Sequence, residues 1–148
     1  GGCGQVMGNG SVWQFGDSWQ RALGSEGAHT LTYLRSLLEA YAWQKLIPDV
    51  ANTFLTGGIQ TDGDRAVAAC ARDRSFGLLY MPSARSVTMN LAQLAGPQVS
   101  IHWYDPSNGY LSIVSGSPFP ASGMRTFIPV AKNASGHSDW VLILESIK

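Results

Sequence analysis

Residues 98–114 hold the clearest pattern of apolar and polar positions in this chain. Val99, Ile101 and Trp103 alternate with Ser, His and Tyr residues, and this period of two is typical of a strand with one buried face. The segment Asp105 to Gly109 then combines a proline, an asparagine and a glycine, which favour a tight turn, and the Asp105 side chain is expected to cap it. The pattern therefore predicts a β-hairpin at the centre of the domain.

Short apolar runs separated by turn residues continue on both sides of this hairpin. They predict strands at residues 66–71, 76–81, 86–91, 98–104, 110–114, 124–130 and 139–146, with a shorter extended piece at 53–55. The last run is apolar at nearly every position, which indicates a central strand covered on both faces. Because no helices intervene, we expect a mainly β fold, an antiparallel β-sandwich of about eight strands.

One amphipathic helix is predicted before these strands, over residues 25–43. Ser25 is the expected N-cap, with an acidic residue following it in the first turn. Pro48 ends the helical pattern and forces the preceding residues into extended geometry. An apolar stripe with helical spacing, widened by Leu37, should dock on the sandwich through Leu31, Leu34, Leu38 and Tyr41.

Composition narrows the classes of partner. Only 14% of the 148 residues are charged, against roughly 25% in an average soluble domain, which is typical of a module that packs against another surface. The formal net charge of zero argues against nucleic acid and against an anionic membrane, since both require a basic face. No apolar run approaches the ~18 residues of a membrane span. The chain begins without an initiator methionine, so we expect a fragment or a processed form.

The residues show no catalytic or metal-binding constellation. The acidic residues fall mostly in turns, no G-x-S-x-G motif is present, and His137-Ser138-Asp139 is too short a spacing for a hydrolase triad. Asp139 is expected to cap a turn instead. Two cysteines and three scattered histidines give no metal-ligand spacing, so neither a metal nor a cofactor is expected. Cys3 and Cys70 are expected to be unpaired thiols.

Exposed aromatic side chains are the better candidates for ligand contact. On the predicted central strand, His102 and Tyr104 point away from the core face, and Tyr110 follows the turn. Residues 1–24 form either an irregular packing loop or a glycine-rich ligand-binding loop, to which Asn9 and Trp13 would belong. Such aromatics suit a neutral polysaccharide or a protein groove, because neither offers a charge to hold.

Several segments resemble one known family, the C-terminal part of the apiosidase-like glycoside hydrolases, whose tail carries the name putative collagen-binding domain of a collagenase. The likeness lies in GNGSVWQF (8–15), in residues 22–49, and in the strand sequences VSIHWYDPSNG, RTFIPV and DWVLIL. The resemblance implies that residues 1–48 are the end of a (β/α)8 barrel and that residues 49–148 are the β-sandwich. It also implies that the catalytic acids lie upstream and that the location is extracellular or periplasmic.

These observations favour a non-catalytic accessory module of a glycoside-hydrolase-like protein, giving structural support or carbohydrate contact. A protein-binding module, for collagen or another extracellular protein, is the first alternative, and a stand-alone enzyme is the second. Because a helix face shared with a barrel would be open in this chain, a homodimer through that face is also expected.

Overall fold

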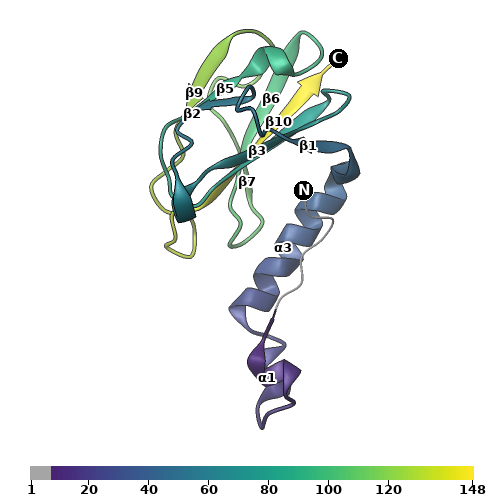
Figure 1. Ribbon diagram of the computed structural model, residues 1–148, viewed down its shortest axis with the longest axis vertical. Coiled ribbons are helices and arrows are strands. Elements are labelled where there is room, and N and C mark those ends of the chain that lie inside the picture. The colour runs from purple at the N-terminus through teal and green to yellow at the C-terminus, as the bar shows by residue number, and fades with distance from the viewer. Residues whose placement is uncertain (1–7) are drawn as a thin grey trace.

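The computed structural model describes residues 8–148, and they form two β-sheets with a long helix against one side (Figure 1). The helices are α1 (Gly10–Trp13), α2 (Trp19–Ala22) and α3 (Glu26–Ala40), with 3-10 turns η1 (Trp43–Lys45), η2 (Asp62–Asp64) and η3 (Leu91–Gln93). The strands are β1 (Leu46–Pro48), β2 (Leu55–Gly57), β3 (Val67–Ala71), β4 (Phe76–Met81), β5 (Val87–Asn90), β6 (Gln98–Tyr104), β7 (Leu111–Ile113), β8 (Phe119–Pro120), β9 (Met124–Phe127) and β10 (Trp140–Ile147).

Every strand pairing is antiparallel. The larger sheet has the order β1-β3-β4-β10-β6-β7, with β8 also pairing with β6, and the smaller sheet has the order β2-β5-β9. The predicted mainly β antiparallel sandwich is confirmed, with ten strands rather than about eight. The two additional strands, β1 and β8, are short and begin or end at prolines, which weakens their sequence signal.

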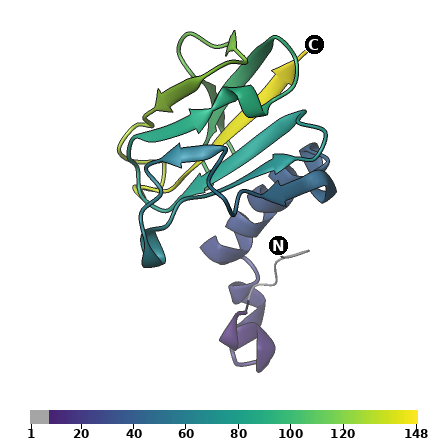
Figure 2. The same cartoon turned by 45° about the horizontal axis from the view of Figure 1, so that its top comes forward.

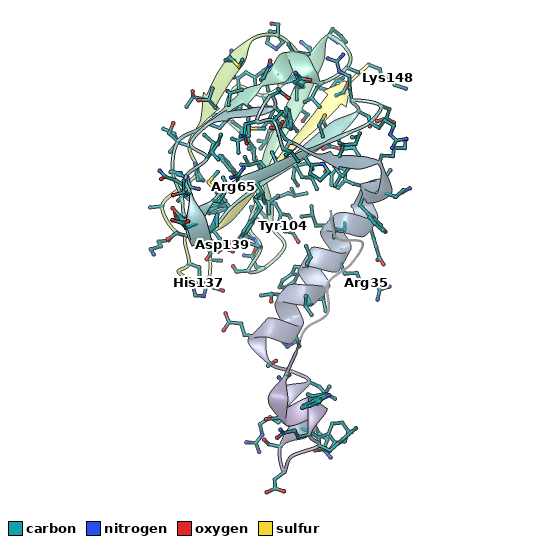
Figure 3. The ribbon with its side chains drawn as sticks, in the orientation of Figure 1. Arg35, Arg65, Tyr104, His137, Asp139 and Lys148 are labelled. Carbon is teal, nitrogen blue, oxygen red and sulfur yellow. The ribbon has the colours of Figure 1, made fainter. Side chains whose placement is uncertain are left out.

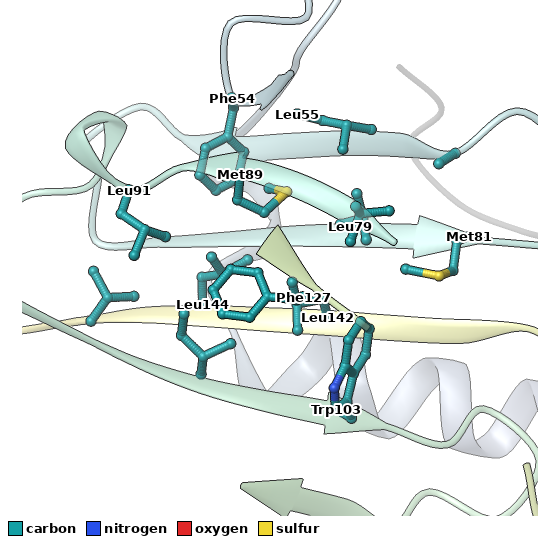
Figure 4. Close-up of a cluster of buried hydrophobic side chains, with 14 of the residues drawn as sticks. Phe54, Leu55, Leu79, Met81, Met89, Leu91, Trp103, Phe127, Leu142 and Leu144 are labelled. Atoms are coloured by element: carbon teal, nitrogen blue, oxygen red, sulfur yellow. The ribbon is translucent and has the colours of Figure 1, made fainter. Parts of the chain in front are cut away.

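The core lies between the two sheets (Figure 4). Val99, Ile101 and Trp103 are buried in it, as the alternation of β6 predicts. Phe127 from the smaller sheet and Leu142 from β10 belong to the same cluster, so side chains of both sheets fill one layer. The sandwich core therefore follows directly from the period of two in the strands.

Strand β10 is covered on both faces, which confirms the prediction from its continuous apolar run. It lies between β4 and β6 in the larger sheet. Leu142 and Leu144 belong to the sandwich core, whereas Val141 and Ile143 belong to a second buried cluster under α3. The larger sheet is thus the middle layer of the molecule.

Helix α3 docks on the outer face of the larger sheet mainly with residues other than the four that were predicted to dock. Leu37 is buried against Val141 and Ile143, and Tyr33 and Tyr41 pack beside it. The predicted stripe of Leu31, Leu34 and Leu38 lies on the flank of this contact and is only partly buried or exposed. The face of α3 that contacts the sheet carries Tyr33 and Tyr41. The spacing of the leucines alone does not predict this face. Tyr41 is the one predicted docking residue that packs there.

The segment before α3 contains two single-turn helices where an irregular loop was expected. The Asn9 side chain caps α1 by accepting from the backbone N–H groups of Ser11 (3.1 Å) and Val12 (3.5 Å). This segment lies at the end of α3 that is far from the sandwich (Figures 1 and 2). Ser25 is the N-cap of α3 as predicted, although its hydroxyl makes no capping hydrogen bond. Cys3 lies outside the described residues.

Candidate functional site

A groove of about 470 Å³ lies between the amino-terminal half of α3 and the larger sheet. Its lining comes from α3, from the ends of β4 and β6, from the start of β10, from the β6–β7 turn and from the loop of residues 128–139 that joins β9 to β10. Tyr104, Asp139 and His137 mark its position on the side of the sandwich that faces α3 (Figure 3). The groove therefore gathers segments that are far apart in the sequence.

The sheet contributes a row of three side chains to the groove. Tyr80 on β4 and Tyr104 on β6 are both register partners of Val141 on β10, so all three project toward α3. On the opposite wall, Leu31 and Leu34 belong to the stripe that was predicted to dock on the sheet. Two tyrosines and several aliphatic side chains thus give the groove an apolar floor.

Tyr104 lies on the predicted face of β6, but its predicted exposure is wrong. Only 5% of its surface is exposed because α3 covers it. Its hydroxyl donates to the backbone carbonyl of Tyr33 at 2.8 Å and so joins β6 to the helix. Burial first, and then its neighbours Tyr33 and Asp105, raise the pKa of Tyr104. The residue lines the groove mainly as part of the wall.

Asn133 shapes the loop along one edge of the groove. Its buried side chain accepts from the backbone N–H groups of Ser135 (3.1 Å) and His137 (3.0 Å). Its amide nitrogen donates to an Asp139 carboxylate oxygen at 2.9 Å. One buried amide therefore holds His137 and Asp139 beside the groove, a use of polar burial that requires satisfied hydrogen bonds.

Asp105 connects the same loop to the β6–β7 turn. Its buried carboxylate accepts from the backbone N–H and hydroxyl of Ser107, at 2.8 and 2.5 Å, and from the N–H of Ala134 at 2.8 Å. The predicted hairpin is confirmed, and Asp105 caps its turn as expected. Among the described residues, Asp105 and Asn133 are the two buried polar side chains, and both serve the loops around the groove.

The rim of the groove is polar and carries acidic groups. Tyr80 and Asp139 both line the groove, and burial first, and the Asp139 carboxylate second, raise the pKa of Tyr80. His137 lies 4.0 Å from Glu26 of α3, measured from Nε2 to Oε1, and both side chains are largely exposed. The described lining contains no lysine or arginine. The arrangement can offer hydrogen-bond donors and acceptors to a small ligand without attracting an anion.

The other predicted ligand-binding residues are not brought together. His102 lies on the helix-facing side of β6, with Nδ1 4.0 Å from Oε2 of Glu145. Tyr110 is exposed after the turn, Trp13 is exposed on α1, and the Asn9 side chain is engaged in capping α1. Of the predicted set, only Tyr104 lines the groove, and the ligand roles of the other residues stay predictions.

Sequence reasoning missed Tyr80, Asn133 and Glu26 and treated Asp139 as a turn-capping acid. The bond from Asn133 agrees with a capping role for Asp139, but the pairing of β10 with β4 also brings it to Tyr80. Tyr80 had a weak signal, since it is a polar-tipped aromatic at the end of the apolar run FGLLYM. The residues of the groove come together through the register of β4, β10 and β6, which no single segment of the sequence contains.

Within residues 8–148, no three His, Cys, Asp or Glu side chains gather as a metal site would require. No helix in this part of the chain is long and apolar enough to cross a membrane. Cys70 is a free, partly buried thiol, and burial raises its pKa. It therefore lacks the thiolate character of a reactive cysteine.

Comparison with known proteins gives one family match. Residues 47–145, about two thirds of the chain, match the family described as "Putative collagen-binding domain of a collagenase". No curated protein matches the chain in sequence.

The solved structures that share the fold include two glycoside hydrolases. A structure titled "Glycoside hydrolase" matches with a TM-score of 0.74 at 23% identity, over 86% of this chain and 27% of that one. A glycoside hydrolase family 5 protein from Bacteroides vulgatus matches with a TM-score of 0.74 at 25% identity, over 86% of this chain and 26% of that one. The chain spans about a quarter of the length of these hydrolases.

Proposed function

Because the chain belongs to the family described as "Putative collagen-binding domain of a collagenase", we propose that it is a non-catalytic accessory module of a glycoside-hydrolase-like protein. In this proposal the sandwich is the module, and the segment before it joins the module to a catalytic domain. The observation that carries the proposal is the apolar, open surface of that preceding segment. Trp13 and Phe15 are 80% and 72% exposed at the far end of α3.

An exposed aromatic cluster of this kind is costly in water and typical of an interaction surface. Phe15 stacks edge-on against Trp19 at 5.4 Å between ring centroids, and Trp13 is exposed on the neighbouring helix α1. Leu23, also exposed, lies between this patch and α3. A catalytic domain packed on this end would bury all of these side chains together.

The comparisons support the same division of the chain. The hydrolase structures match 86% of the chain, which is more than the region 47–145 of the family match. The shared fold therefore extends into the residues before the sandwich. This agrees with the proposal that residues 1–48 belong with a catalytic domain and residues 49–148 form the accessory module.

The groove supports a non-catalytic role, even though two carboxylates line it. Glu26 has a side chain that is 75% exposed, and Asp139 is engaged with Asn133. A glycosidase needs one carboxyl group kept protonated, usually by burial in an apolar pocket. Glu26 is not buried in this way, and the Asn133 amide holds Asp139 in place. We expect no turnover of chromogenic glycosides by the purified chain, and measurable turnover would contradict a non-catalytic role.

The docking surface is tested with the purified chain and the double variant Trp13→Glu/Phe15→Glu. We expect the wild-type chain to bind a hydrophobic dye and to self-associate with rising concentration in sedimentation, because its docking patch is open. The double variant should lose both properties and keep its melting temperature. The matched control, Tyr110→Glu, changes an exposed aromatic on the β6–β7 hairpin and should keep both. A wild-type chain that stays monomeric and binds no dye would contradict the proposal.

A protein-binding role is the second candidate, favoured by the edge strand β7. Tyr110, Leu111 and Ile113 are exposed along this edge of the larger sheet. A row of exposed apolar side chains of this kind is typical of a protein-binding surface. The family name points to collagen as the ligand. Binding of the chain to fibrillar collagen that is lost in the variant Ile113→Lys would support this role. An unchanged affinity for collagen in that variant would exclude it.

A further inference from the structure

We infer that the groove between α3 and the larger sheet is a binding site for a neutral saccharide. This inference rests on the proposed function, because it assigns a ligand class to an accessory module of a glycoside-hydrolase-like protein. It concerns a different surface from the aromatic patch of α1 and α2. The two can therefore be tested separately.

The first argument is the way in which the groove is constructed. Burying a polar side chain is costly unless every hydrogen bond is made. In the described part of the chain, the buried polar side chains are those of Asp105 and Asn133, and both hold loops at the groove through hydrogen bonds. The fixed positions of His137 and Asp139 are what a binding site requires from its supporting residues.

The second argument is the chemistry of the lining. Saccharides present both hydroxyl groups and apolar C–H faces, so their sites combine hydrogen-bonding side chains with aromatic and aliphatic surfaces. Apolar side chains line the groove on both sides, Val141 from the sheet and Leu34 from α3. Its rim offers Tyr80, His137 and Asp139 for hydrogen bonds. Its volume of about 470 Å³ lies within the range of small-molecule pockets, which suits a mono- or disaccharide.

The third argument is charge, which selects a neutral ligand over an anionic one. Glu26 and Asp139 contribute carboxylates to the groove, and its described lining includes no lysine or arginine to balance them. Uronic acids, sulfated sugars and phosphates would meet like charge there. Neutral sugars have no such cost and can use the carboxylates as hydrogen-bond acceptors.

The test is a calorimetric titration of the whole chain with panels of neutral and acidic oligosaccharides. We expect saturable binding of at least one neutral sugar, with no binding of acidic sugars. Tyr80→Ala and His137→Ala should each weaken it by about tenfold, the effect of losing one good contact. Both residues are exposed enough for the variants to fold, which an unchanged melting temperature would verify. Tyr80→Phe separates the hydroxyl from the ring, and Tyr110→Ala, outside the groove, is the control that should bind normally.

The inference is overturned if no neutral sugar binds, or if binding survives both Tyr80→Ala and His137→Ala. Preference for acidic sugars would overturn it as well. If no sugar binds but the aromatic patch drives association, the proposed function stands and only the groove assignment fails. If sugar binds and the chain stays monomeric without dye binding, the docking proposal fails and the groove assignment stands.

Discussion

Replacing Leu37 by alanine should destabilise the fold much more than the same change at Leu34, one turn earlier on α3. The two leucines have the same chemistry and the same helix. Leu37 is 7% exposed and packs on the outer face of β10, whereas Leu34 is 37% exposed at the groove. The comparison therefore measures which stripe of the helix docks on the sheet.

The expected cost follows from burial. Leu→Ala changes in protein cores cost about 2–5 kcal/mol, depending on how far the site can collapse. The helix is an outer layer bordered by a groove, so it can relax toward the sheet, and we expect about 2–3 kcal/mol for Leu37→Ala. Leu34→Ala removes surface that is already partly in water, and its cost should be about 1 kcal/mol. For a domain of this size, the Leu37 variant should melt about 4–12 °C lower.

The assay is urea unfolding followed by tryptophan fluorescence and far-UV circular dichroism, with both probes required to coincide. A cost for Leu34→Ala that equals or exceeds the cost for Leu37→Ala would refute the docking geometry. That result would favour the stripe of Leu31, Leu34 and Leu38 that the leucine spacing predicts.

Three further predictions concern polar groups. Asp105→Ala should cost about 2–3 kcal/mol in urea unfolding, because the backbone N–H groups of the turn and of the neighbouring loop lose a charged acceptor. Asp49→Ala should cost a similar amount, about 2–3 kcal/mol in urea unfolding, because the Asp49 carboxylate accepts from three successive backbone N–H groups of residues 53–55. The control Thr53→Ala removes only a hydroxyl that donates to the same carboxylate, and it should cost less than about 1 kcal/mol. Burial first, and the Glu145 carboxylate next, raise the pKa of Tyr41 above its ordinary value of 10.0. The unfolded chain therefore loses this proton at a lower pH than the folded chain, so the free energy of unfolding should be constant below pH 10.0 and fall as the pH rises above it. Melting temperatures measured between neutral and alkaline pH should fall less steeply in Tyr41→Phe than in the wild-type chain.

Much of the sandwich could be predicted because its strands carry strong local signals. The alternation of β6 and the apolar run of β4 predict those strands with the bounds that the structure has. The continuous apolar run of β10 predicts a strand covered on both faces. The turn chemistry of Asp105 to Gly109 predicts the hairpin. In each case one short segment contains the whole signal.

The docking face of α3 and the groove could not be predicted in the same way. The helix has apolar side chains over a wide arc. Tyr33 and Leu37 are the ones that pack on the sheet, because they face the outward-pointing side chains of β6 and β10. The groove depends on the register of β4, β10 and β6, which brings Tyr80 and Asp139 together. Such contacts are fixed by tertiary pairing, and no local pattern in a single sequence encodes them.

The central claim is that ligand binds on the side of the sandwich that faces α3. An amide NMR titration of the isotope-labelled chain tests it most directly. The ligands are the neutral oligosaccharide panel and a triple-helical collagen peptide, added separately. The account predicts that shifts concentrate at Tyr80, His137 and Asp139 on addition of a neutral sugar. Shifts confined to β7 or to the smaller sheet, with every ligand, would contradict it.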